Sequence, residues 1–250
     1  MNIHSLFILK KTGACIYSRS FTDEIHYDIN LMTPFFSAIF SFTENVISRK
    51  IEVLEMGGLR FLFKIKDDFI FVILSDSNVS ILFVDTRLVR TSEVFFERFP
   101  NTNVIVDYQE IEDNEFDLII DQLITGKDVI FESELLYGKI IKIFRDLVSK
   151  NEIIGAAVLS TDGHVIYSIL PDEILARSLK ELEIRFKVGT VKLPELFYSL
   201  ENGQKVFSKL VEISWKRDNF IIVMLFENSV PLGMAEITLN KVSKAIIGMI

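Results

Sequence analysis

The strongest constraint on the fold of this chain is that it spells nearly the same hairpin twice. Residues 8–18 read ILKKTGACIYS and residues 158–168 read VLSTDGHVIYS, so glycine, isoleucine, tyrosine and serine recur at an offset of 150. In each stretch two β-prone runs flank a glycine-containing turn. Asp162-Gly163 predicts a tight hairpin turn, for which we expect positive φ at both central residues.

A second repeat supports the first. Residues 67–82 read DDFIFVILSDSNVSIL and residues 218–233 read DNFIIVMLFENSVPLG, at an offset of 151. Both begin with acidic or amide turn residues and continue as a nearly continuous apolar run. Such a run is typical of a strand that is covered on both faces, near the centre of a sheet.

A helix follows the first hairpin in each half. In the first half we expect it to begin at Thr33-Pro34, because proline is tolerated at the first helical position. The apolar residues of its predicted core face follow one another at spacings of 4, 3 and 4 residues. That face comprises Phe35, Ile39, Phe42 and Val46. In the second half Pro171 opens the helix, whose apolar face comprises Leu175, Leu179, Leu182 and Phe186.

Another hairpin, a continuous strand and a long helix complete each half. The predicted turns lie at Gly57-Gly58 and at residues 201–204. The order strand-strand-helix-strand-strand-strand-helix thus occurs twice. It predicts an α+β fold of two domains, each a five-stranded antiparallel sheet flanked by helices. We place the domains at residues 1–130 and 131–250, with an added helix near 113–125 in the first and one ahead of the hairpin in the second.

These residues resemble two related families. Residues 1 to about 128 resemble a longin domain through FILKKTGACIYSRSF, PFFSAIFSF and DDFIFVILSD. Residues from about 132 to 250 resemble a roadblock/LC7 domain through IGAAVLSTDGHVIYSIL and NFIIVMLFEN. The resemblance implies profilin-like domains that are near-permutations of one another. It also implies a dimerising platform for small Ras-like GTPases, similar to archaeal longin–roadblock chains.

Composition narrows the function classes. Of the 250 residues, 49% are hydrophobic, and the net charge of −8 disfavours binding to phosphate backbones, so we expect no nucleic-acid partner. The longest apolar run, at 220–226, is far shorter than the ~20 residues of a membrane helix. Cys15 is the only cysteine, which fits a reducing compartment. We expect a cytoplasmic protein that reaches membranes only through partners, without inserting directly.

No stretch of the sequence predicts catalysis, a cofactor or a metal. ITGKDVI at 124–130 lacks the upstream glycine and the following hydroxyl residue of a phosphate-binding loop. The three histidines are far apart, and no GxSxG stretch occurs. The acidic run from Asp107 to Asp121 lacks the ligand pattern of a calcium loop, and it is more typical of a solvated helix start. We therefore expect a protein that is not an enzyme.

One feature does suggest a partner surface. Phe36, Phe40 and Ile47 form a second apolar stripe beside the predicted core face of the first helix. This stripe is either a wide core face or a patch that binds another protein. In the second half, we expect self-association around Leu175, Leu179 and Leu182 and the neighbouring sheet edge.

The first hypothesis is therefore a noncatalytic scaffold that binds or regulates a small Ras-like GTPase, in a membrane-trafficking or polarity assembly. Its expected partners are the GTPase and either a second copy or another longin/roadblock protein. The alternative is a small-molecule sensor, which requires a pocket with a few convergent polar groups. The inward strand positions are filled by Phe, Ile and Val, which argues against such a cavity.

Overall fold

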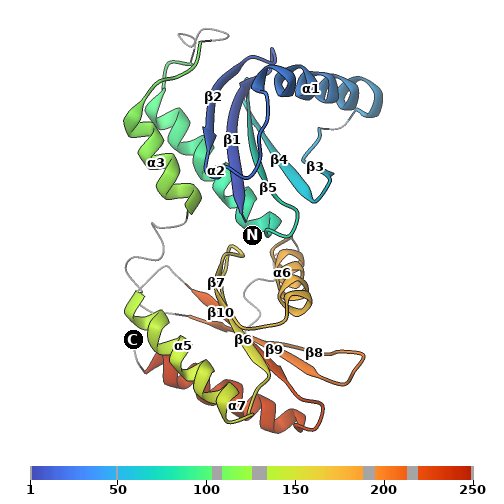
Figure 1. Cartoon of the computed structure of the whole chain (residues 1–250), viewed down its shortest axis with the longest axis vertical. Helices are drawn as coiled ribbons and strands as arrows, with labels where there is room; N and C mark the ends of the chain where they lie inside the picture. Colours follow the sequence, from blue (N-terminus) through green and yellow to red (C-terminus); the bar gives the residue numbers. More distant parts are fainter. Residues whose placement is uncertain are drawn as a thin grey trace. The chain divides into compact units, whose positions relative to one another are not determined.

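The computed structural model of the chain describes residues 2–48, 50–102, 109–125, 134–187, 195–212 and 219–248. The chain divides into two compact units, unit 1 (Met1–Asp128) and unit 2 (Val129–Ile250). Each unit is built on its own sheet (Figure 1), and each is described by itself.

Unit 1 places a helix between its second and third strands and two helices after its fifth. Its strands are β1 (Ile3–Lys10), β2 (Cys15–Ser20), β3 (Val53–Met56), β4 (Leu59–Lys66) and β5 (Phe69–Asp76). Its helices are α1 (Ile29–Phe42), the π-helical turn η1 (Thr43–Ile47), α2 (Ile81–Arg98) and α3 (Asn114–Thr125). The strand order is β2-β1-β5-β4-β3, and all neighbours are antiparallel.

The central strand β5 is buried on both sides because its side chains alternate between two cores. One core receives Phe69, Phe71 and Ile73, and the other receives Ile70, Val72 and Leu74. Helix α1 covers one face of the sheet, while α2 and α3 cover the other (Figure 1). The continuous apolar run of the sequence therefore reflects two covered faces, as predicted.

Unit 2 repeats this plan with one helix moved to its start. Its strands are β6 (Gly155–Ser160), β7 (Val165–Ser168), β8 (Glu195–Ser199), β9 (Lys205–Val211) and β10 (Phe220–Phe226). Its helices are α5 (Glu134–Ser149), α6 (Asp172–Lys187) and α7 (Leu232–Ile247). The order β7-β6-β10-β9-β8 matches that of unit 1 strand for strand. The predicted α+β fold with two five-stranded antiparallel sheets is confirmed.

The helices of unit 2 also form two layers around the sheet. Ile140 and Phe144 of α5 and Leu239 of α7 share one core with Ile222 of β10. Helix α6 lies on the opposite face of the sheet (Figure 1). It reaches β9 through Arg185, whose Nη2 donates a hydrogen bond to Ser208 Oγ at 3.1 Å.

The repeated hairpin turns in the same way in both units. The Gly13 amide donates to the Lys10 carbonyl, and the Gly163 amide donates to the Ser160 carbonyl, at 2.8 and 3.1 Å. The two glycines have φ of +92° and +85°. Pairing also shifts register at equivalent places, between Ile8/Leu9 in unit 1 and Val158/Leu159 in unit 2. The two turns are equivalent corners of two like sheets.

The prediction of positive φ at both Asp162 and Gly163 is wrong. Among the described residues, positive φ occurs at Gly163 and not at Asp162. The hairpin has a three-residue loop, 161–163, with glycine in the left-handed conformation at its third position. Such a loop is the next most common hairpin after the two-residue turn, and it needs only one glycine.

Helices α3 and α5 lie at corresponding sheet edges although they come at opposite ends of their units. Tyr17 of β2 donates a hydrogen bond to Asp117 of α3 at 2.7 Å. Its counterpart Tyr167 of β7 accepts a 3.4 Å hydrogen bond from Arg145 Nε of α5. The repeated tyrosine thus contacts the added helix in both units. The two units differ in where this helix comes in the chain, last in unit 1 and first in unit 2.

Candidate interaction surface

The inner face of α1 is built around Phe36. Phe36 is 2% exposed, and its ring makes edge-on contacts with Phe61 and Phe63 of β4. Phe40 is half-buried and also contacts the Phe63 ring edge-on. Of the two alternatives for this stripe, the structure therefore supports a core face for Phe36 and Phe40 and not a patch that faces a partner. The side chain of Ile47 lies outside the described part of the structure.

The outer face of α1 and η1 is the exposed one, and it is apolar. Its members recur at spacings of 4, 7 and 4 residues, so they share one side of the helix. They are Leu31, Phe35, Phe42 and Val46, which are 72%, 41%, 56% and 66% exposed. We call these four residues the α1 stripe. Three of them, Phe35, Phe42 and Val46, belong to the predicted core face, so that prediction is wrong for these residues.

Helix α1 itself begins earlier than predicted. It starts at Ile29, so Pro34 lies inside it and not at its first position. The amides of Leu31 and Met32 donate to the Asp28 carbonyl, which forms the first turn ahead of the proline. The helix sequence INLMTPFFSAIFSF contains no charged residue. Leu31, Phe35 and Phe42 of the α1 stripe therefore lie on a helix without charge, and Val46 lies on the η1 turn that follows it, which contains Glu44.

Helix α6 occupies the position of α1 in unit 2, but its outer face is charged. Its exposed residues include Glu173, Arg177, Lys180 and the apolar Ile184. The three residues predicted to support self-association are buried instead. Leu175, Leu179 and Leu182 are 5%, 5% and 3% exposed, so they cannot meet a partner directly. The comparison shows that this fold does not require an uncharged outer face on this helix.

Both sheets end in an edge strand that carries exposed apolar residues. Strand β3 exposes Val53 and Met56, at 37% and 44%, and β8 exposes Phe197 at 42%. An unpaired edge offers backbone amides and carbonyls to a strand of another chain. These edges, unlike the buried α6 leucines, can take part in self-association.

The structure brings together a hydroxyl, an imidazole and a carboxylate that sequence analysis missed. His4 Nδ1 lies 2.8 Å from Thr22 Oγ1, and His4 Nε2 lies 2.9 Å from Asp76 Oδ1. The second oxygen of Asp76 accepts a hydrogen bond from the Asn2 amide at 2.8 Å. His4 is only 1% exposed, so its imidazole is out of reach of a substrate. The cluster joins β1, β5 and the segment after β2.

The single cysteine lacks the character of a nucleophile. Burial raises the pKa of the Cys15 thiol to about 11, and a backbone hydrogen bond with Tyr17 offsets this rise only in part. The nearby charge of Glu110 raises the pKa further. A thiol with this pKa is protonated at neutral pH, whereas catalysis and metal binding require the thiolate.

The acidic run begins a helix, as predicted. Asp113 Oδ1 accepts hydrogen bonds from the amides of Glu115 and Phe116 at 3.0 and 3.1 Å, which caps α3. Arg98 pairs with the same carboxylate at 2.8 Å. The hydrogen bond from Arg98 and then those from the two amides hold the pKa of Asp113 below its ordinary value. Among the described residues, no three His, Cys, Asp or Glu side chains gather as metal ligands would. Residues 126–130 of ITGKDVI lie outside them.

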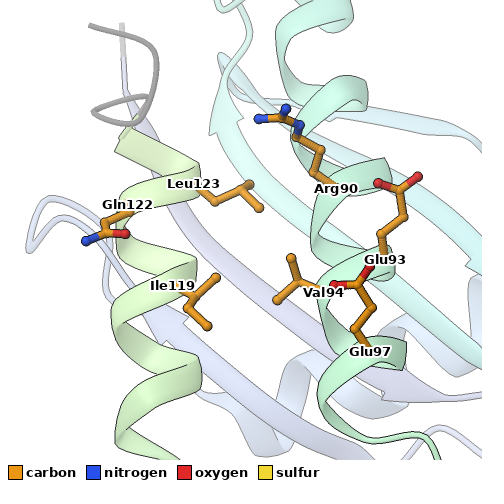
Figure 2. A pocket seen from close by; sticks show the side chains of 7 residues that line it. All are labelled: Arg90, Glu93, Val94, Glu97, Ile119, Gln122 and Leu123. Carbon is orange, nitrogen blue, oxygen red and sulfur yellow. The ribbon is translucent and has the colours of Figure 1, made fainter. Parts of the chain in front are cut away.

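A shallow groove of about 300 Å³ lies between α2 and α3 (Figure 2). Val94 of α2 and Ile119 and Leu123 of α3 give it an apolar floor. Its other lining residues are the polar Arg90, Glu93, Glu97 and Gln122. The groove is a surface feature between two helices. It is not the enclosed cavity that the alternative hypothesis of a small-molecule sensor requires.

Comparison with known proteins gives similarity to solved structures alone. No protein-family model matches the chain, and no curated protein matches it. It is similar to MglB from Myxococcus xanthus at 14% identity and a TM-score of 0.34, over 44% of this chain and 94% of that one. For the gliding protein MglB from Thermus thermophilus the values are 13%, 0.35, 45% and 88%.

The chain is also similar to a chain of a homology model of the full-length AP-3 complex in a stretched open conformation. It is 13% identical with a TM-score of 0.30, and the match covers 76% of this chain and 99% of that one.

Proposed function

We propose that this chain is a noncatalytic interaction protein that binds a small Ras-like GTPase through the α1 stripe. The observation that carries the proposal is the exposure of Leu31, Phe35 and Phe42 on a helix without charge, continued by Val46 on η1. The resemblance of residues 1 to about 128 to a longin domain and of residues from about 132 to a roadblock/LC7 domain supplies the partner class.

The α1 stripe has the chemistry of a protein-binding surface. Burial of exposed apolar side chains releases roughly 25 cal/mol for each Å² removed from water. Aromatic anchors contribute most of the binding energy at many interfaces. Phe35 and Phe42 are the aromatic members of the stripe, and both are exposed enough to be covered by a partner. We therefore assign them as the anchors of the interface.

The scaffold would work as an assembly in the cytoplasm, in membrane trafficking or cell polarity. We propose that it forms a homodimer, or pairs with another longin/roadblock protein, through the open edges of β3 and β8. Within the described part of the chain, no helix has both the length and the apolar run needed to cross a bilayer. Contact with a membrane would come through the partners.

The test is a calorimetric titration of the whole chain with the small Ras-like GTPases of the same genome, loaded with GDP or with a non-hydrolysable GTP analogue. We expect at least one to bind. Substitution of Phe35→Ser together with Phe42→Ser is expected to weaken that binding by about tenfold or more, because two aromatic anchors are lost.

Ile184→Ser is the matched control, because it removes an exposed apolar side chain from α6. It is expected to leave the affinity unchanged. If no GTPase binds in either nucleotide state, the proposed function is wrong. If one binds and the α1 double variant binds equally well, the assignment of the surface is wrong.

A further inference from the structure

We propose that the α2–α3 layer of one copy of this chain binds the outer face of α7 of a second copy. The two surfaces lie on equivalent layers of the two units, since α2 and α7 both follow the central strand of their sheet. One surface carries glutamates and the other carries lysines, and both carry exposed apolar side chains. The contact does not involve α1, so it is independent of the proposed GTPase binding.

The first surface is acidic on one side and apolar on the other. Glu93 and Glu97 point from α2 on one side of the groove, while Ile119 lies on α3 across from them (Figure 2). On α3, Leu118 and Ile119 are 63% and 39% exposed. Within the described part of the chain, neither glutamate has a hydrogen-bond or ion-pair partner. Arg90 lies one turn before Glu93.

The second surface has the opposite charge. Met234, Ile237, Lys241 and Lys244 recur on α7 at spacings of 3, 4 and 3 residues, so they share one side of the helix. Met234 and Ile237 are 55% and 48% exposed, and both lysines are exposed. Over the residues that the structure describes, neither lysine pairs with a carboxylate.

Each surface carries a local electrostatic cost that the other would remove. Glu93 and Glu97 are like charges four residues apart, and Lys241 and Lys244 are like charges three residues apart. Like charges at these spacings face each other on a helix and repel. Contact between the two surfaces would add attraction between the glutamates and the lysines, which would offset both repulsions.

The dimensions of the two surfaces also agree. On α7 the centre of the apolar pair precedes the centre of the lysine pair by seven residues, which is about 10 Å along a helix. Packed helices such as α2 and α3 lie about 8–10 Å apart. An α7 helix that crosses the layer therefore places Met234 and Ile237 over α3 and the lysines over α2.

The test uses sedimentation velocity of the whole chain at low and high salt. We expect wild-type chains to form a larger species near 50 mM salt that is lost near 500 mM, because exposed charge pairs are screened. Two charge-reversal variants are compared, Glu93→Lys with Glu97→Lys, and Lys241→Glu with Lys244→Glu. Each alone is expected to weaken association by about tenfold or more, since like charges then face each other.

An equimolar mixture of the two variants provides the decisive readout. In the mixture each reversed surface meets a complementary one, so the larger species is expected to return. An edge-strand dimer would persist in both variants, and GTPase binding should be unchanged in them. A carbodiimide, which joins carboxylates to adjacent amines, should link Glu93 or Glu97 to Lys241 or Lys244 between ¹⁵N-labelled and unlabelled copies. Identical sedimentation of wild type, variants and mixture would overturn the proposal, as would the absence of these cross-links.

Discussion

At the scale of single residues, the repeated turn depends on glycine for a steric reason. Gly13 has φ of +92°, and a Cβ built on it would lie 2.1 Å from Ser37 Oγ of α1. Gly138, in contrast, lies inside α5, where an added Cβ meets no atom within 4 Å among the described residues. The same substitution therefore has opposite consequences at these two positions.

We expect Gly13→Ala to destabilise the chain by about 1–2 kcal/mol or more, because the left-handed backbone is strained and Ser37 must move. Gly138→Ala should stabilise it by about 0.5–1 kcal/mol, because alanine restricts the unfolded chain and favours the helix. Urea unfolding of both variants beside the wild type measures the two changes. Equal effects at the two positions would refute this account of the turn.

Tyr17 joins β2 to α3, and its hydroxyl gives this contact a dependence on pH. Burial raises the pKa of Tyr17 above its ordinary value, and its hydrogen bond to Asp117 raises it further. The folded chain thus holds the phenolic proton more tightly than the unfolded chain. The resulting stabilisation is complete below the unfolded pKa of about 10 and is lost as pH rises above it.

We therefore expect the free energy of unfolding to fall between pH 9 and 11 more steeply in the wild type than in Tyr17→Phe. At neutral pH this variant should lose about 1–2 kcal/mol, because Asp117 loses a hydrogen bond but keeps Arg19 at 3.2 Å. Denaturant unfolding at each pH measures both effects. Parallel pH profiles of the two proteins would show that the Tyr17 hydroxyl contributes nothing to this dependence.

At the scale of elements, strands were easier to predict than the orientation of helices. The runs at β5 and β10 indicate strands covered on both sides, because alternate residues of β5 enter two cores and every residue of β10 is buried. Helix α1 is apolar on two sides, so periodicity finds both stripes without showing which one faces the sheet. The ring contacts of Phe36 with β4 settle that choice.

A matched pair of substitutions tests the orientation of α1. Phe36→Ala should destabilise the chain by about 3–5 kcal/mol, because it leaves a cavity beside Phe61 and Phe63. Phe35→Ala should change stability by less than about 1 kcal/mol, because Phe35 is 41% exposed. Thermal and denaturant unfolding compare them directly. A larger loss at Phe35 than at Phe36 would mean that the helix is turned the other way.

The cluster of Thr22, His4 and Asp76 shows another limit of sequence analysis. His4 is 18 residues from Thr22 and 72 from Asp76, and they meet because β1 pairs with β5 while the chain after β2 returns beside it. No motif marks such a cluster. Its detection requires the register of the strands, which in unit 1 shifts near Ile3/Ser5.

At the scale of the whole molecule, the two units share one plan and differ in what they expose. The repeated hairpin and the repeated central strand predict the shared plan, because turns and cores are constrained by backbone geometry. The outer faces are free of that constraint. Helix α1 exposes an uncharged stripe where α6 exposes charges, and the α2–α3 layer exposes carboxylates where α7 exposes lysines. The two units thus share one fold but present different residues on its surface.

The α1 stripe is proposed to bind a small GTPase. Hydrogen exchange of the chain, followed by mass spectrometry with and without a saturating GTPase that binds, tests it most directly. We expect slower exchange in α1 and η1, residues 29–47, and unchanged exchange in α6, residues 172–187, because only the former presents the uncharged stripe. Protection confined to α6, or unchanged exchange across residues 29–47, would contradict the claim.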